Sequence, residues 1–173
     1  MKILNLHGCQ EQRHNSAYEA LIANGCAVKS LSMDYDAESP RRIRNRLRKI
    51  IKAYHIEVIV GSGLGGFYAA VLSAELYLPV ILVDPVLLPF LMLSEHTEDY
   101  VALFGTLSAL ERRKVSCIIG ERSDCVRLLG FVRNLLMNRR FCIVPEGEYS
   151  NGTMPLKAYF AEVLQYYSTI LPH

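Results

Sequence analysis

The sequence lacks the features that would place the chain in a membrane, at a metal site or on nucleic acid. It contains no apolar run long enough to cross a bilayer, and the apolar stretch over residues 1–8 is too short for a signal peptide. The formal net charge is only +2, so no overall charge attracts nucleic acid or a membrane surface. The five cysteines form no closely spaced pair of the kind that holds a metal ion. We therefore expect no metal site, no membrane partner and no nucleic-acid partner.

The composition is that of a globular protein. Hydrophobic residues make up 51% of the 173 residues and charged residues 21%, which predicts a single domain over residues 1–173 with a sizeable core. No internal repeat, low-complexity stretch or linker divides the chain. An odd number of cysteines without a secretion signal favours free thiols in a reducing compartment, so we expect a cytoplasmic protein.

Apolar strand-like segments alternate with helical segments along the whole chain. The predicted strands cover residues 2–6, 27–31, 56–60, 80–83, 116–120 and 141–144. The predicted helices run from a capping box at Ser16 to Gly25, from Pro40 to about Tyr54, onward from Gly66, from Ser123 to Met137, and from Pro155 to about Ile170. Residues 85 to about 110 are apolar and irregular, which predicts a small cap segment.

This alternation predicts an α/β fold, a three-layer sandwich with a mostly parallel sheet of about six strands. Ligands of such sheets bind beyond the carboxyl ends of the strands. Five residues that follow predicted strands are therefore expected to share one rim: His7, Gly63, Asp84, Asp124 and Tyr149.

The turn Gly61-Ser62-Gly63-Leu64-Gly65 has the frame of a nucleophile elbow with the nucleophile missing. The frame is G-x-S-x-G between a strand and a helix, and its glycines permit a sharp, strained turn. Here the third position is Gly63. The segment therefore predicts the geometry of an elbow without its hydroxyl, unless it is only a glycine-rich strand–helix turn.

Three stretches together resemble the YqiA/UPF0227 esterase family of small single-domain α/β-hydrolases. They are Leu6-His7-Gly8, the elbow from Val60 to Ala69, and Gly120 to Asp124. The resemblance implies an α/β-hydrolase-like domain without a cofactor, a Ser-Asp-His triad, and a small-molecule or acyl/ester ligand. It places the nucleophile at Gly63 and the acid at Asp124.

The same resemblance implies that the catalytic histidine is also replaced. The equivalent turn, Pro145 to Ser150, contains no histidine, and Tyr149 is the expected occupant of that position. An oxyanion hole is built from backbone N–H groups, here the one of Leu64 and one near Cys9, so it can outlast the triad. We therefore expect an esterase-like protein whose catalysis is lost or severely impaired, with a retained pocket for a small ligand or a partner.

Three residues beside the elbow have two readings each. Ser62 is a shifted nucleophile or a structural hydroxyl bonded to its neighbours. Cys9 is a substitute nucleophile of an active esterase or thioesterase, or a small apolar loop residue. His7 is a catalytic base or a brace for the loop after the first strand. In each case we expect the structural role.

The remaining polar candidates are also ambiguous. His96 reaches from the cap into the pocket or is a solvated surface residue, and Asp84 is a spare acid or a turn residue. Asp124 is a relict acid or the N-cap of the following helix.

The helix over residues 41–52 is rich in arginine, which offers a third functional hypothesis, a binding module. Its apolar stripe from Ile43 to Tyr54 instead favours a helix that packs on the sheet and exposes its arginines to solvent. Asp34, Asp36 and Glu38 precede this helix and would supply counter-charge at its N-terminus.

Overall fold

The computed structural model describes residues 1–9, 11–121, 123, 136, 138, 140–145 and 155–171. The strands are β1 (Lys2–Leu6), β2 (Ala27–Ser30), β3 (Val58–Ser62), β4 (Val80–Val83), β5 (Val115–Gly120) and β6 (Phe141–Val144). The helices are α1 (Ser16–Ala23), α2 (Pro40–Tyr54), α3 (Gly63–Leu76), α4 (Thr97–Gly105) and α7 (Leu156–Ile170). Three short 3-10 turns, η1 (Pro89–Leu91), η2 (Thr106–Ala109) and η3 (Arg112–Lys114), flank α4. Within this part of the chain no helix is both long and apolar enough to cross a bilayer.

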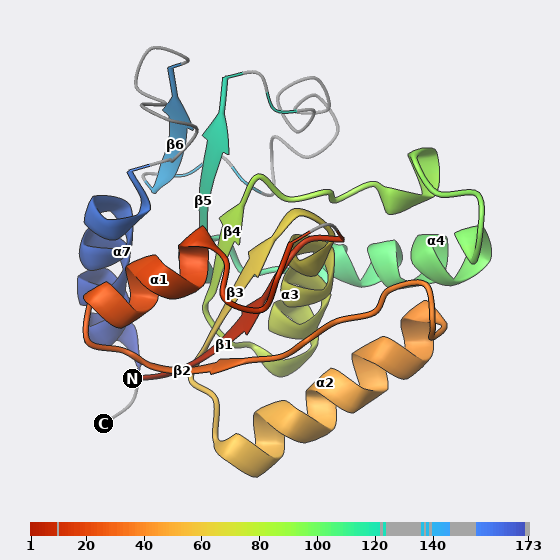
Figure 1. Ribbon diagram of the computed structural model, residues 1–173, viewed down its shortest axis with the longest axis horizontal. Coiled ribbons are helices and arrows are strands. Elements are labelled where there is room, and N and C mark those ends of the chain that lie inside the picture. Colours follow the sequence, from red (N-terminus) through yellow and green to blue (C-terminus); the bar gives the residue numbers. More distant parts are fainter. Residues whose placement is uncertain are drawn as a thin grey trace.

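The six strands form one parallel sheet in the order β2-β1-β3-β4-β5-β6 (Figure 1). The predicted parallel α/β architecture is therefore confirmed. The chain goes from β1 outward to β2, then crosses back over β1 to β3 and continues in the opposite direction. The order therefore reverses between β1 and β3. In open parallel sheets such a switch point opens a crevice at the carboxyl ends of the two strands, which is where ligands bind.

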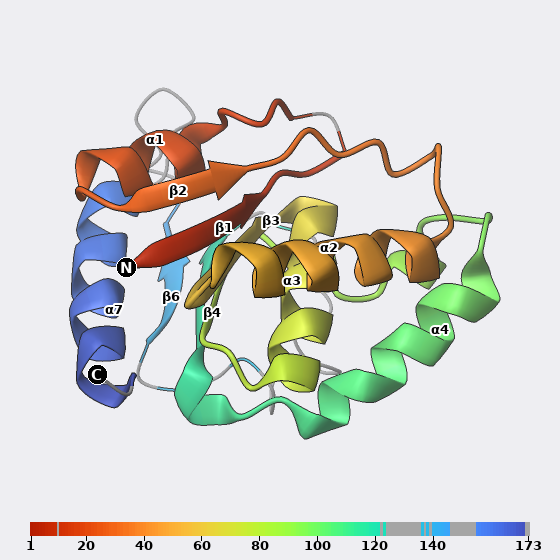
Figure 2. The ribbon, with the colours of Figure 1, turned by 90° about the horizontal axis from the view of Figure 1, so that it is seen from below.

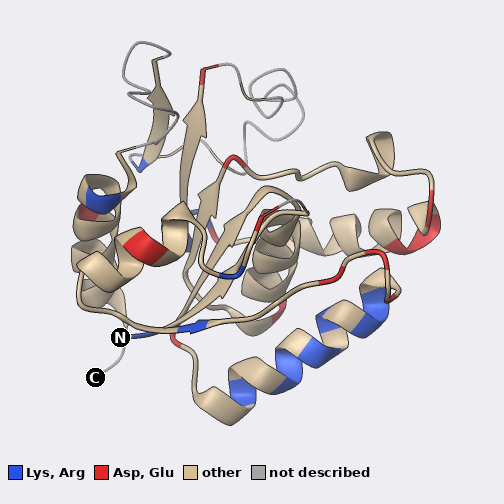
Figure 3. Ribbon diagram, in the orientation of Figure 1, with Lys and Arg blue, Asp and Glu red and all other residues tan. Residues whose placement is uncertain are grey.

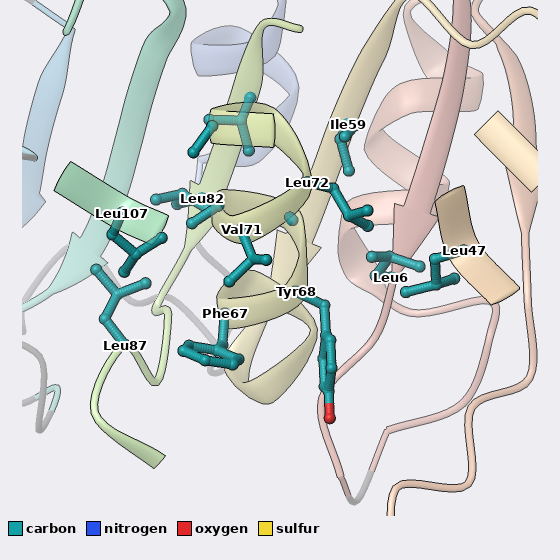
Figure 4. Close-up of a cluster of buried hydrophobic side chains, with 14 of the residues drawn as sticks. Leu6, Leu47, Ile59, Phe67, Tyr68, Val71, Leu72, Leu82, Leu87 and Leu107 are labelled. Carbon is teal, nitrogen blue, oxygen red and sulfur yellow. The ribbon is translucent and has the colours of Figure 1, made fainter. Parts of the chain in front are cut away.

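Helices cover both faces of the sheet. Figures 1 and 2 show α1 and α7 on one face and α2, α3 and α4 on the other. Side chains of β3 alternate accordingly, because successive residues of a strand point to opposite faces. Val58 and Val60 pack in the cluster that contains Phe160 of α7, whereas Ile59 packs with Leu47 of α2 and Leu72 of α3. Figure 4 shows this second cluster, in which α3 contributes side chains from several turns.

Several predicted element ends are wrong by a few residues. The capping box at Ser16 does not form, because Asn15 is the N-cap and its side chain accepts a hydrogen bond from the N–H of Tyr18 at 3.0 Å. The third strand starts two residues later than predicted and reaches Ser62. Helix α3 then starts at Gly63 and not at Gly66, since the elbow itself is the first turn of the helix. Smaller differences occur at β2, β5 and α7. The helix predicted over 123–137 falls largely outside the described residues.

A buried tyrosine hydroxyl joins helix α7 to the sheet. Tyr167 of α7 is fully buried, and its hydroxyl lies 2.8 Å from Ser116 Oγ, from the carbonyl oxygen of Val80 and from that of Lys114. These partners belong to β4, to β5 and to the residue before β5. The hydroxyl therefore satisfies backbone groups at the amino ends of two neighbouring strands and fixes α7 against them.

We expect Tyr167→Phe to lower the free energy of unfolding by about 1–2 kcal/mol, since buried carbonyl groups lose their hydrogen-bond partner. Urea unfolding followed by circular dichroism measures the change. Tyr166→Phe is the matched control, because the Tyr166 hydroxyl bonds the carbonyl of Arg113 at 3.2 Å in an exposed position. Equal losses in the two variants would contradict the assignment.

Candidate functional site

The turn between β3 and α3 has the backbone of a nucleophile elbow. Strand β3 ends at Ser62, and Gly63 opens α3 with φ of +51°, in the left-handed region. An elbow holds its nucleophile in such a strained conformation so that the side chain stands clear of the turn. Gly63 is partly exposed, in contrast to the buried residues on either side of it. The position from which a nucleophile would project is therefore open, and it carries no side chain.

The flanking glycines are required by close backbone approach. A Cβ on Gly65 would lie 2.5 Å from the carbonyl oxygens of Leu6 and His7, and a Cβ on Gly61 would lie 2.5 Å from the carbonyl oxygen of Gly65. Real Cβ atoms do not occur at such distances from backbone. At Gly63, in contrast, an added Cβ would meet only the Gly8 Cα, at 3.3 Å. Space thus forbids a side chain at Gly61 and Gly65 and permits one at Gly63.

His7 braces the loop after β1. Its Nε2 accepts a hydrogen bond from the N–H of Met33 at 2.9 Å, so its Nδ1 carries the proton and donates to the carbonyl oxygen of Gly8 at 2.6 Å. The ring is 2% exposed, and the hydroxyl of Tyr35 donates to the His7 carbonyl oxygen at 2.5 Å. Both ring nitrogens are therefore occupied, and neither can take a proton from a group at residue 63.

Ser62 belongs to a polar network behind the elbow. The side-chain amide of Asn15 donates to Ser62 Oγ at 3.2 Å and to Glu11 Oε2 at 2.8 Å. The same carboxylate oxygen accepts the N–H of Gly8 at 2.9 Å. Ser62 itself is 4% exposed. The hydroxyl is thus held by Asn15, and a carboxylate lies against the loop that faces Gly63.

The backbone donors that could form an oxyanion hole differ in their surroundings. Leu64 is at the start of α3, where N–H groups have no intrahelical acceptor. Cys9 is exposed and close to the predicted second donor, but the Gly8 N–H next to it is engaged by Glu11. Burial, and secondly the charge of Asp36, raise the pKa of the Cys9 thiol, although its own backbone N–H opposes this. At neutral pH the thiol is protonated and weakly nucleophilic.

Asp84 ties the end of β4 to the end of β5. Its backbone has φ of +41°, its N–H donates to the carbonyl oxygen of Ile118 at 3.0 Å, and its Oδ1 accepts the N–H of Gly120 at 2.8 Å. Burial raises the pKa of this carboxyl and the charge of Glu11 adds to the rise, while hydrogen bonds from Gly120 and Ser123 oppose it. Asp84 therefore fixes the carboxyl end of β5, the strand that precedes Asp124 in the sequence.

The structure brings some of the predicted site residues together. His7, Cys9, Ser62, Gly63 and Leu64 lie at the carboxyl ends of β1 and β3. Asp124 and Tyr149, the expected acid and histidine positions, lie outside the described residues. His96 is exposed, and it lines a cavity of about 340 Å³ between the start of α4 and the loop after β2.

Four residues near this site were not found by sequence reasoning: Glu11, Asn15, Tyr35 and Tyr100. Tyr35 and Tyr100 line the cavity, and Tyr68 stacks on Tyr35 with ring centroids 5.6 Å apart. Glu11 is three residues from Gly8 in a turn that has no periodic pattern, and the tyrosines read as ordinary core residues. Only the proximity of Glu11 to the Leu6-His7-Gly8 stretch was a usable signal.

Ion pairs engage part of the arginine-rich helix. Arg41 pairs with Asp99 at 2.8 Å, Arg44 with Glu75 at 3.5 Å, and Arg46 with Glu38 at 2.9 Å. Figure 3 shows that basic residues occur along the whole of α2. Ile43, Leu47 and Ile51 are buried against the sheet, as the apolar stripe predicts.

Comparison with solved structures identifies the class of fold. A monoacylglycerol lipase from Paleococcus ferrophilus is similar with a TM-score of 0.62 and 14% identity, over 96% of this chain and 94% of that one. Est1E from Butyrivibrio proteoclasticus, solved with ferulic acid, has a TM-score of 0.65 and 12% identity over 95% and 89%. A dienelactone hydrolase from Anabaena variabilis has a TM-score of 0.60 and 15% identity over 99% and 87%. The chain thus has an α/β-hydrolase fold.

The family follows from the sequence match. The model of the uncharacterised protein family UPF0227 matches residues 2–120, and the chain belongs to this family. The match covers β1 through β5, including the elbow at Gly63, and the expected family membership is confirmed. A comparison with functionally curated proteins found no match.

We expect Gly65→Ala to lower the free energy of unfolding by about 3 kcal/mol, because backbone carbonyl groups cannot move away from the new Cβ. Gly105→Ala is the matched control. No atom lies within 4 Å of a Cβ at Gly105, and alanine favours the helix there. Urea unfolding measures both. An equal, small effect at the two positions would show that α3 does not pack on β1 as described.

The raised pKa of Asp84 implies that the free energy of unfolding depends on pH. Its folded-state pKa is raised, so its contribution is greatest below the ordinary carboxyl pKa of about 3.9 and is lost as pH rises through the folded-state value. Asp84→Asn keeps the acceptor for Gly120 and removes the titration. We expect the stability of wild type relative to the variant to fall as the pH rises above about 4, the ordinary carboxyl pKa. Asp34→Asn, which replaces an exposed carboxylate, is the control, and parallel stability profiles of wild type and Asp84→Asn would contradict the assignment.

Proposed function

We propose that this protein is a non-catalytic or severely impaired member of its esterase-like fold, and that it binds a small molecule beside the vestigial elbow. The observation that carries the proposal is Gly63, which has the positive φ of a nucleophile and no nucleophilic atom. Acyl transfer needs a nucleophile with an adjacent base. The similar solved structures include a lipase and a dienelactone hydrolase. In our proposal this protein has the same fold as these hydrolases but does not hydrolyse esters.

The other candidate groups near the elbow support this proposal. Ser62 is buried, and its Oγ accepts a hydrogen bond from Asn15, which gives this hydroxyl a structural role. Cys9 has a raised pKa, and His7, the histidine of the same loop, cannot act as its base because both of its ring nitrogens are engaged. An active esterase or thioesterase that uses Ser62 or Cys9 would have to break these contacts first.

The electrostatics of the loop also oppose ester hydrolysis. Hydrolysis builds negative charge on an oxygen that must face backbone N–H donors. Here the Glu11 carboxylate takes the Gly8 N–H. A Cβ at Gly8 would lie 3.6 Å from Glu11 Oε2 and 3.7 Å from the Gly63 Cα, so this negative charge is close to the elbow. A developing oxyanion would be repelled there.

The direct experiment is ester turnover. We expect purified protein to hydrolyse p-nitrophenyl acetate no faster than a heat-killed sample, because Gly63 supplies no nucleophile and Glu11 occupies the Gly8 N–H that an oxyanion would need. Neither a fluorophosphonate nor iodoacetamide should label Ser62 or Cys9 selectively. A turnover number of ~1 s⁻¹ would overturn the proposal. The labelled residue would then identify the nucleophile.

The same assay on two variants of Gly63 distinguishes the effect of an added hydroxyl from the effect of backbone strain. Gly63→Ser and Gly63→Ala impose the same left-handed strain, about 1–2 kcal/mol, and only the first adds a hydroxyl. We expect neither to hydrolyse the ester, since a serine without a base is protonated. Adding Tyr149→His to Gly63→Ser should raise activity in a strongly non-additive way if Tyr149 holds the histidine position. Measurable activity in Gly63→Ser that Tyr149→His does not increase would assign the base elsewhere.

A further inference from the structure

A cavity next to the loop after β1 is formed by two segments far apart in the sequence, one of which contains Tyr35, whose hydroxyl donates to the His7 carbonyl oxygen. Its volume is about 340 Å³, enough for a small organic molecule. Tyr35 and Asp36 come from the loop after β2, and the other lining residues come from the start of the cap and from α4: Met92, Leu93, Ser94, Glu95, His96 and Tyr100. Cys9 is close by, since the charge of Asp36 acts on its thiol.

The charge of this lining is negative. Asp36 and Glu95 contribute carboxylates, and the described lining residues include no lysine or arginine. Two arginines of α2 are in ion pairs, Arg41 with Asp99 and Arg46 with Glu38, and the charge of Arg46 also acts on the lining residue Tyr35. Figure 3 shows acidic stretches on both segments, the loop before α2 and the start of α4. A positively charged group in the cavity would therefore meet the carboxylates of Asp36 and Glu95, while Arg46, the cation that acts on Tyr35, is paired with Glu38.

Aromatic rings complete the cavity. Tyr35 and Tyr100 both line it, and the faces of tyrosine rings attract cations. Tyr100 is only 2% exposed, and its hydroxyl lies 3.5 Å from that of Tyr68. Of two hydroxyls that face each other only one can donate to the other. Within the described chain, one hydroxyl proton of this buried pair has no acceptor, so an oxygen of a ligand can take it.

We propose that this cavity binds a small organic cation, an amine or quaternary ammonium compound that also carries an oxygen acceptor. The carboxylates of Asp36 and Glu95 and the tyrosine rings hold the cationic end, Met92 and Leu93 contact its methyl groups, and the hydroxyl of Tyr100, which only accepts from Tyr68, donates to its oxygen. The inference rests on the proposed function, because it takes this cavity as the retained ligand pocket. It goes further in naming the charge of the ligand.

The test compares two probes that differ in one atom. Choline and 3,3-dimethylbutan-1-ol have the same shape and hydroxyl, and only choline is charged. Isothermal titration of both probes is run at about pH 8, where an ordinary imidazole is neutral. We expect choline to bind at least ~10-fold more tightly than the neutral alcohol.

Charge-neutralising variants locate the site. Asp36→Asn and Glu95→Gln should each weaken choline binding by about 3- to 5-fold and leave the neutral alcohol unaffected. Glu98→Gln is the matched control, because Glu98 is an exposed residue of α4 that does not line the cavity. It should bind choline as the wild type does.

The outcomes separate the two proposals. Equal affinity for the two probes, a preference for the neutral alcohol, or no choline binding overturns the assignment of a cation. A loss in Glu98→Gln as large as in Asp36→Asn also overturns it, since the effect would then be one of general surface charge. The proposed function fails on a different measurement, ester turnover by the same preparation, whichever probe binds.

Discussion

The contact on which this site depends is the backbone packing of the first turn of α3 against the end of β1. Gly65 lies so close to the carbonyl oxygens of Leu6 and His7 that no other residue fits. This contact joins the two strands between which the order of the sheet reverses, and it holds the loop after β1 within contact distance of Gly63. The elbow is therefore shaped by its glycines and by the sheet. Its geometry does not require a nucleophile, which explains how the turn persists with Gly63 at its tip.

The polar groups around the elbow are used for structure. His7 connects Gly8 to Met33, Asn15 connects Ser62 to Glu11 and caps α1, and Asp84 holds the end of β5. In an enzyme, such groups are aimed at a reacting atom and are often incompletely satisfied. Here each of the three has protein partners. The negative charge of Glu11 and Asp36 adds to this, because it favours cationic ligands and disfavours an oxyanion.

Much of the fold could be predicted because its signals are local and periodic. Alternating apolar strands and helices indicate a parallel sheet covered on both faces, and Pro40 with the stripe from Ile43 to Tyr54 predicts α2 closely. The errors arose where side-chain contacts override local pattern. Asn15 caps α1 in place of Ser16 because its amide also bonds Asn5, Glu11 and Ser62. Helix α3 starts at Gly63 because a left-handed glycine can begin a helix directly after a strand.

The sequence by itself determined the order of elements, the frame of the elbow and the absence of a hydroxyl at residue 63, since these depend on residue type and on spacing within a few positions. The tertiary structure decided which distant side chains meet. It brought Glu11 to Gly8 beside Gly63, Met33 to His7, and Tyr35 and Asp36 to Tyr100 across a cavity. These contacts are made by irregular loops, whose paths follow from packing on the completed sheet and not from any repeat in the chain. For that reason the glycine at the third position of the elbow frame is visible in the sequence, and the charge of the neighbouring pocket is visible only in the fold.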